Sequence, residues 1–161
     1  MPKTILAGIV AVLAGCGVAE AGDLACGAFT LIGGEKGITV VDNPPAGKSA
    51  GDMRAGWRRL ADEAGAPAGT VDFVAVLTEP DAAGGDVLAG DYYVRLDKGT
   101  IASQTVYQLP DAADTSQKAR NAVLIVTGGT GAFAGVTGTI EIVAGEAPRY
   151  VFDLACRTSV K

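Results

Sequence analysis

The sequence contains no histidine among its 161 residues. Histidine is the usual general base near neutral pH and the most frequent metal ligand in proteins. Its absence excludes Ser-His-Asp and Cys-His catalysis, and it excludes metal sites that include an imidazole. We therefore expect a function that needs no metal and no other cofactor.

The chain also lacks an excess of positive charge and is poor in aromatic residues. Its formal net charge is −5, and no basic stripe interleaved with aromatic residues is present, so nucleic acid is not an expected partner. Aromatic residues make up 6% of the chain, whereas apolar residues make up 48% and glycine occurs 23 times. Frequent glycine beside Val, Thr and Ile indicates one domain of short strands joined by tight turns.

The first residues have the features of an export leader. The apolar run Thr4–Gly15 is too short to span a bilayer. The sequence Leu-Ala-Gly-Cys16 has the form of a lipobox, and lipidation at Cys16 would be the protein's attachment to a membrane. Ala19–Ala21 instead fits ordinary signal cleavage. Both interpretations predict an exported protein, and the alternative is a cytoplasmic protein in which this segment is part of the fold.

Two cysteines remain beyond this leader, which we place at residues 1–21, before a single domain at 22–161. Cys26 lies near the start of that domain and Cys156 near its end. A pair at opposite ends of a small exported domain is typical of a disulfide that joins the terminal strands. The alternative is two unpaired buried thiols.

Eight segments have the composition or the alternation of strands. They are Leu24–Ile32, Ile38–Asp42, Thr70–Glu79, Asp91–Leu96, Thr100–Leu109, Ala122–Thr127, Gly138–Val143 and Arg149–Cys156. The alternation is clearest in the last segment, where Tyr150, Phe152 and Leu154 share one face, as in a half-buried strand.

The segment Asp52–Ala64 fits two interpretations. Met53, Trp57 and Leu60 fall on one helical stripe, which favours a helix. Gly56 weakens a helix, and strand alternation also groups Met53 with Trp57. Periodicity alone favours the helix.

A glycine-rich stretch, "VTGGTGAFAGVTGTIEI", follows a strand-like run and partly matches a dinucleotide-binding fingerprint. Such a fingerprint must open a helix, so that backbone N–H groups face the pyrophosphate. The β-branched residues that follow Ala134 instead predict a strand. We therefore interpret Gly128, Gly129 and Gly131 as a hairpin turn whose glycines allow positive φ.

This stretch resembles the penultimate hairpin of the allene oxide cyclase and dirigent barrel superfamily. The segments "GDMRAGWRRLADEAGAPAGTVDFVAVL" and "RLDKGTIASQTVYQL" are similar to further motifs of the superfamily in the same order. The "DEAGAPAGT" and "DYYVRL" segments are also similar to bacterial spirotetronate-type cyclases. The resemblance covers roughly Ile38 to Cys156, and its most specific part is the glycine hairpin.

The resemblance implies a single eight-stranded antiparallel β-barrel, an all-β fold with a central apolar pocket. It also implies a homodimer or homotrimer, and a strand rather than a helix at Met53–Ala61. A closed barrel of about eight strands can hold one small ligand. The expected partner is thus a small apolar molecule.

The expected pocket is built from aromatic and amide side chains. Tyr93 is the closest match to a pocket tyrosine of the spirotetronate-type cyclases. Alternation argues differently, because Tyr92 shares a face with Val94 and Leu96 while Tyr93 shares one with Arg95 and Asp97, so which of the two points inward stays open. Either would polarise a substrate carbonyl as a catalytic residue. The expected substrate-binding residues are Trp57, Phe73, Gln104, Tyr107 and Phe133. The pair Arg58-Arg59 is too short to imply an anionic partner.

Three functions fit these features. The first is a cyclase of the isomerase or pericyclase type that folds an elongated apolar substrate, because positioning alone can contribute about 7–11 kcal/mol to lowering a barrier. The second is a dirigent-like or lipocalin-like binder of an apolar ligand in the cell envelope, and the third is a structural envelope protein. The barrel resemblance favours the first two.

Overall fold

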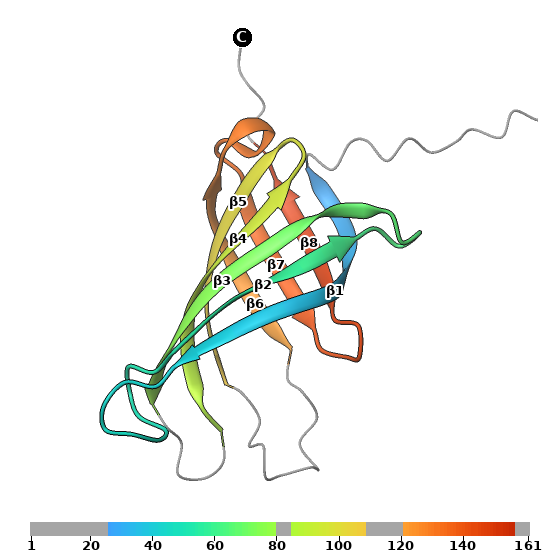
Figure 1. The fold of residues 1–161 in the computed structure, drawn as a ribbon. Coiled ribbons are helices and arrows are strands. Elements are labelled where there is room, and N and C mark those ends of the chain that lie inside the picture. Colours follow the sequence, from blue (N-terminus) through green and yellow to red (C-terminus); the bar gives the residue numbers. More distant parts are fainter. Residues whose placement is uncertain (1–25, 80–84, 109–120, 157–161) are drawn as a thin grey trace, which may run out of the picture.

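The chain folds into a closed antiparallel barrel of eight strands, as expected. The computed structural model describes residues 26–79, 85–108 and 121–156. Each strand pairs with its neighbours in the sequence, and β1 pairs with β8 to close the barrel (Figure 1). The strands are β1 Gly27–Val41, β2 Met53–Ala61, β3 Pro67–Glu79, β4 Val87–Leu96, β5 Gly99–Gln108, β6 Ala122–Gly129, β7 Thr137–Val143 and β8 Arg149–Ala155.

Alternating side chains separate the packed interior from the outer surface. In β8, Tyr150, Phe152 and Leu154 are buried, as the alternation of that segment predicts. In β4, Tyr92 and Val94 are buried. This burial of every second side chain follows from the two-residue period of a strand.

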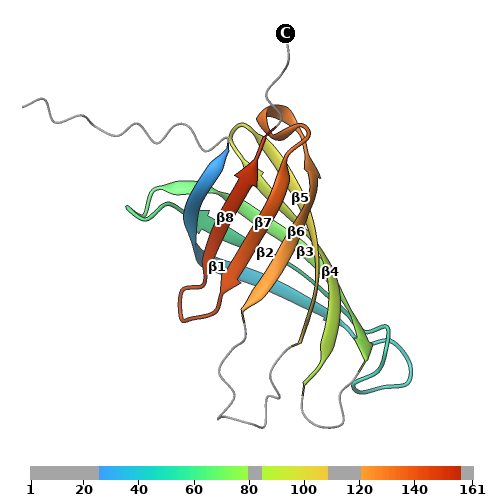
Figure 2. The same cartoon turned by 180° about the vertical axis from the view of Figure 1, so that it is seen from behind.

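The barrel has a packed end and an open end. The packed end holds Phe133, Val136 and Ile140 beside Leu31 and Phe152, all at most 1% exposed. At the other end β1–β3 extend away from β6–β8 (Figures 1 and 2). Ile38 and Val40, although they line the interior there, are 51% and 62% exposed. The interior is therefore filled at one end and open to solvent at the other.

A bulge in β1 changes which residues of that strand face inward. The register with β2 shifts by one residue between Gly33 and Lys36, so that Gly33 pairs with Leu60 but Lys36 pairs with Arg58. A bulge inserts an unpaired residue and reverses the alternation beyond it. Lys36 and the next alternate residues consequently line the interior.

The segment with helical periodicity is strand β2, so the resemblance predicted it correctly and the periodicity did not. Leu60 is buried inside the barrel, while Trp57 lies on the opposite face, so the two do not share a stripe. Gly56 explains the strand, because a Cβ there would overlap the Phe73 ring and the carbonyl of Gly37. Glycine also has a low helix propensity, so Gly56 favours the strand over the helix on both grounds.

The glycine stretch connects β6 to β7, with two differences from the expected turn. Gly128 and Gly129 belong to the end of β6. Gly131, with φ of 61°, begins a three-residue 3₁₀ helix, Gly131–Phe133, and not a longer helix that could hold a pyrophosphate. The chain returns as a strand at Thr137.

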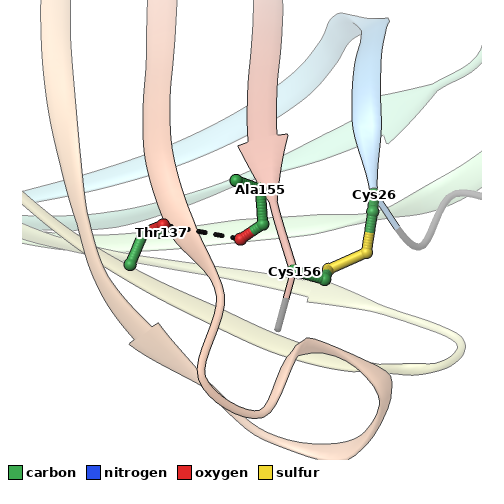
Figure 3. Close-up of a disulfide and its surroundings, with 4 residues drawn as sticks. All are labelled: Cys26, Thr137, Ala155 and Cys156. Carbon is green, nitrogen blue, oxygen red and sulfur yellow. Dashed lines mark hydrogen bonds between the residues drawn. A yellow bond between two sulfur atoms is a disulfide. The ribbon is translucent and has the colours of Figure 1, made fainter. Parts of the chain in front are cut away.

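The expected disulfide joins Cys26 to Cys156, with the two Cα atoms 5.7 Å apart (Figure 3). It links the residue before β1 to the residue after β8, and these two strands also pair in the sheet. Beside it the Thr137 hydroxyl donates to the Ala155 carbonyl at 3.5 Å. The prediction from the terminal placement of the pair is confirmed.

The expected leader, with both cleavage signals, lies outside the described residues. Within the described ranges, no helix is both long enough and apolar enough to cross a membrane.

Candidate functional site

The open end of the barrel contains a cavity of about 430 Å³. It reaches from the bulge of β1 across β2–β5 to the ends of β6–β8. Its lining combines apolar, aromatic and cationic side chains: Lys36, Ile38, Val40, Arg54, Arg58, Phe73, Tyr92, Tyr107, Gln108, Ala122, Ile142, Ala144, Gly145, Pro148 and Tyr150. No carboxylate is among these described residues.

Aromatic rings form the floor of this cavity, where it meets the packed core. The Phe73 and Tyr92 rings stack with centroids 5.6 Å apart and an interplanar angle of 20°. Phe73 and Tyr107 pack against the same core cluster that contains Tyr92. These three side chains thus contact the packed core on one side and line the cavity on the other.

The buried phenols of Tyr92 and Tyr150, which both line the cavity, keep their protons. Burial raises the pKa of Tyr92 above its ordinary value of 10.0, and the hydrogen bond between Tyr92 and Tyr107 raises it further. Burial also raises the pKa of Tyr150, although the Arg58 guanidinium opposes this effect. Neutral phenols at these positions can donate hydrogen bonds to an oxygen that gains negative charge.

The cations of the lining come from β1 and β2. Arg54 and Arg58 lie on the inner face of β2, and Arg58 Nη1 donates to the Gly34 carbonyl of the β1 bulge at 2.9 Å. Lys36 stands directly opposite Arg58 in the register. Together they give the cavity a local positive charge that contrasts with the net charge of the chain.

A smaller pocket of about 210 Å³ adjoins the cavity at Arg54, which lines both. Its buried carboxylate is Asp86, whose side chain is 6% exposed. Lys48 Nζ lies 3.0 Å from Asp86 Oδ1, and Arg54 Nη2 lies 4.0 Å from Oδ2. The Lys48 contact is an ion pair without hydrogen-bond geometry, since Oδ1 has no hydrogen-bond partner. Lys48 and Arg54 thus compensate the negative charge of Asp86, and Arg54 lies where this pocket meets the cavity.

The structure brings together three of the predicted site residues, Tyr92, Phe73 and Tyr107. Of the two tyrosines between which the resemblance and the alternation disagree, Tyr92 is 6% exposed and lines the cavity, whereas Tyr93 is 46% exposed on the outer face. The even-numbered residues of β4 point inward because Leu88 and Val94 belong to the core.

The other predicted residues lie away from the cavity. Trp57 is 37% exposed on the outer face of β2, where its indole packs over Gly37. Gln104 is on the outer face of β5 and donates to Asp91 Oδ1 at 2.8 Å. Phe133 is fully buried at the packed end. We do not include these residues, or Tyr93, in the candidate site.

Sequence reasoning missed Tyr150, Arg58, Arg54 and Lys36. Tyr150 could have been found, because its alternation already placed it on the buried face of the last strand. Arg54 and Arg58 are four residues apart, which places them on one face in a helix and in a strand alike. Only the closed barrel shows that this face is the inner one. Lys36 depends on the bulge, which has no clear signal in the sequence.

Comparisons with known proteins support the fold. No family model matches the sequence, and no curated protein matches it. Among solved structures, a pyocyanin demethylase superposes with a TM-score of 0.66 at 21% identity, covering 80% of this chain and 99% of that one. AbnU, an exo-specific intermolecular Diels-Alderase, superposes with a TM-score of 0.54 at 12% identity, covering 79% and 95%.

A third structure, a nonspecific heme-binding cyclase of neoabyssomicin biosynthesis, has a TM-score of 0.50 at 15% identity and covers 82% of this chain and 63% of that one. At these identities the likeness concerns the barrel architecture. The described residues contain no group of three or more His, Cys, Asp or Glu side chains that could hold a metal ion.

Proposed function

We propose that this protein is a cyclase of the pericyclase type, which folds an elongated unsaturated substrate inside the barrel. The observation that carries the proposal is the cavity of about 430 Å³, with its stacked Phe73–Tyr92 floor and its phenol donors. A cavity of this size suits a small molecule, and apolar walls with a few placed polar groups are typical of ligand sites.

The neighbouring structures support this class of chemistry. Two of them are named as cyclases or Diels-Alderases, and all share the barrel. The pyocyanin demethylase shares it too, so the fold alone does not set the reaction. The residues of the cavity therefore carry the argument. The proposed membership of the wider allene oxide cyclase superfamily rests on the sequence motifs.

The cavity residues are suited to a cyclisation without proton transfer. Such a reaction needs a chain held in a reactive shape, and positioning can contribute about 7–11 kcal/mol. Phe73, stacked on Tyr92, and Ile142, which also lines the cavity, would be apolar boundaries for the chain. The protonated phenol of Tyr92 would donate to a substrate carbonyl as negative charge develops on its oxygen. Tyr107, which lines the same cavity and interacts with the Tyr92 phenol, would orient that phenol.

The neighbouring tyrosines Tyr92 and Tyr93 provide a matched test. We expect the full-length protein to cyclise at least one member of a panel of linear polyenes that carry a carbonyl-activated alkene, with product measured by mass spectrometry. Tyr92→Phe should lower turnover by about 10- to 1,000-fold, because a transition-state hydrogen bond is lost. Tyr93→Phe, on the outer face, should leave turnover unchanged.

Equal turnover in the two variants would contradict the assigned role of Tyr92. Tight binding of the polyenes without any product would instead support the alternative function, a non-catalytic binder of hydrophobic ligands. Export of the protein, lipidation at Cys16 and assembly as a homodimer or homotrimer remain parts of the proposal that rest on the sequence.

A further inference from the structure

The inner face of the barrel contains a pair of like charges, and none of the described residues places a compensating carboxylate beside it. Lys36 and Arg58 stand directly opposite each other in the β1–β2 register, and both line the cavity. Like charges directly opposite on one face of an antiparallel pair are destabilising. On the outer face of the same two strands the adjacent pair is complementary, with Arg59 Nε 3.1 Å from Glu35 Oε2.

Neither Lys36 nor Arg58 forms an ion pair with any of the described residues. Arg54 differs, because it lies 4.0 Å from the buried Asp86. Arg54 is also four residues along the strand from Arg58, or roughly 13 Å at 3.3 Å per residue. The uncompensated charge is therefore concentrated at Lys36 and Arg58.

The structure holds Arg58 in place at this point. Its Nη1 donates to the Gly34 carbonyl at 2.9 Å, which occupies one of the five guanidinium donors. Gly33 makes the room, since a Cβ there would lie 2.7 Å from Arg58 Cδ and 3.1 Å from Tyr150 Cε2. The phenol of Tyr150 interacts with the same guanidinium. The bulge thus both positions Arg58 and brings Lys36 onto the inner face.

We propose that Lys36, Arg58 and Tyr150 form a carboxylate-binding subsite at the edge of the cavity. This inference rests on the proposed function and specifies its substrate: an elongated unsaturated molecule with a carboxylate at one end. Arg58 and Lys36 supply charge-assisted donors, and Tyr150 adds a neutral one. The unsaturated chain then extends over the aromatic floor toward Tyr92.

The test uses cis-parinaric acid, a fluorescent polyene carboxylate, and its uncharged methyl ester as probes. Both are titrated into the full-length protein at about pH 8, where a carboxylic acid is ionised. We expect the wild type to bind the acid more tightly than the ester. Arg58→Gln should weaken binding of the acid by about tenfold or more, since a charge-assisted hydrogen bond is lost. The ester should be affected much less.

Arg59→Gln is the matched control, because Arg59 is the next residue but lies on the outer face, paired with Glu35. It should leave the affinity for both probes unchanged. Lys36→Gln provides a second variant at an exposed position if Arg58→Gln does not fold, and it should reduce the preference for the acid in the same direction.

Three outcomes would overturn the subsite. They are equal affinity of the wild type for acid and ester, equal loss in the Arg58 and Arg59 variants, and parallel loss of both probes in Arg58→Gln. In each case the ester still reports whether the cavity binds a polyene. If the ester binds but the acid has no advantage, only the subsite fails. If neither probe binds, the proposed function fails as well.

Discussion

Tyr92 and Tyr150 make the stability of the folded protein sensitive to alkaline pH. Burial raises the pKa of both phenols above 10.0, so the folded state retains these protons after the unfolded chain has released them. The free energy of unfolding is therefore not reduced by these phenols below about pH 10, where both states keep the protons. It falls as the pH rises past that value, because only the unfolded chain then releases them.

We expect the free energy of unfolding, measured by urea denaturation, to fall between about pH 9 and about pH 11. In Tyr92→Phe the fall should be shallower, because one of the two phenols no longer titrates. Tyr93→Phe serves as the control for loss of a phenol outside the barrel. Identical slopes in wild type and Tyr92→Phe would show that burial of Tyr92 does not retain its proton.

Among individual residues, the sequence predicts three members of the candidate site and misses four. Phe73, Tyr92 and Tyr107 were expected because aromatic residues on strands of a barrel form its pocket. The choice between Tyr92 and Tyr93 could not be made from the sequence, because the resemblance matches Tyr93 whereas alternation groups Tyr92 with the apolar Val94 and Leu96. Burial of Val94 within the closed sheet decides it.

At the scale of elements, the connection between β6 and β7 depends on one glycine. Gly131 has φ of 61°, and a Cβ there would overlap the Lys98 carbonyl in the β4–β5 turn. Gly131→Val should therefore destabilise the protein by at least about 1–3 kcal/mol, because a β-branched residue is strained at positive φ.

Gly145→Val is the control for this change, because the nearest atom to a Cβ at Gly145 is the Ala147 carbonyl oxygen at 3.7 Å. Urea denaturation measures both variants. A Gly131→Val protein as stable as the Gly145→Val protein would contradict the packing of the two turns against each other.

The elements also show where sequence periodicity is insufficient. The strand β2 carries helical spacing of Met53, Trp57 and Leu60 only because its two faces both contain apolar residues. Its partner strands decide the conformation, since β2 pairs along its whole length with β3. The bulge at Gly33 is likewise a property of the pairing with β2, which the sequence of β1 alone does not specify.

At the scale of the whole molecule, the disulfide reinforces closure of the barrel. It joins residues 130 positions apart, next to the pairing of β1 with β8. Replacing Cys26 and Cys156 together by Ser should lower the free energy of unfolding by roughly 2–5 kcal/mol, because a cross-link restricts the unfolded chain.

Urea denaturation of the double variant and of the wild type with and without reductant tests this. Reduced wild type should match the variant. No difference between oxidised wild type and the variant would show that strand pairing alone accounts for closure.

The barrel as a whole could be predicted, because the glycine hairpin and the further motifs occur in the order of a known barrel superfamily. The terminal cysteines agreed with it, since closure of a barrel makes the first and last strands neighbours. The open end could not be predicted, because it arises from the different lengths of the strands and from the course of β1–β3.

The most direct test of the central claim is a crystal structure of the full-length protein with cis-parinaric acid bound. We expect the polyene to lie in the cavity, over the Tyr92 ring and beside Phe73, with its carboxylate at Arg58. Binding instead to the exposed outer face formed by Val106, Val123 and Ile125, with no ligand in the cavity, would show that the barrel interior is not the substrate site.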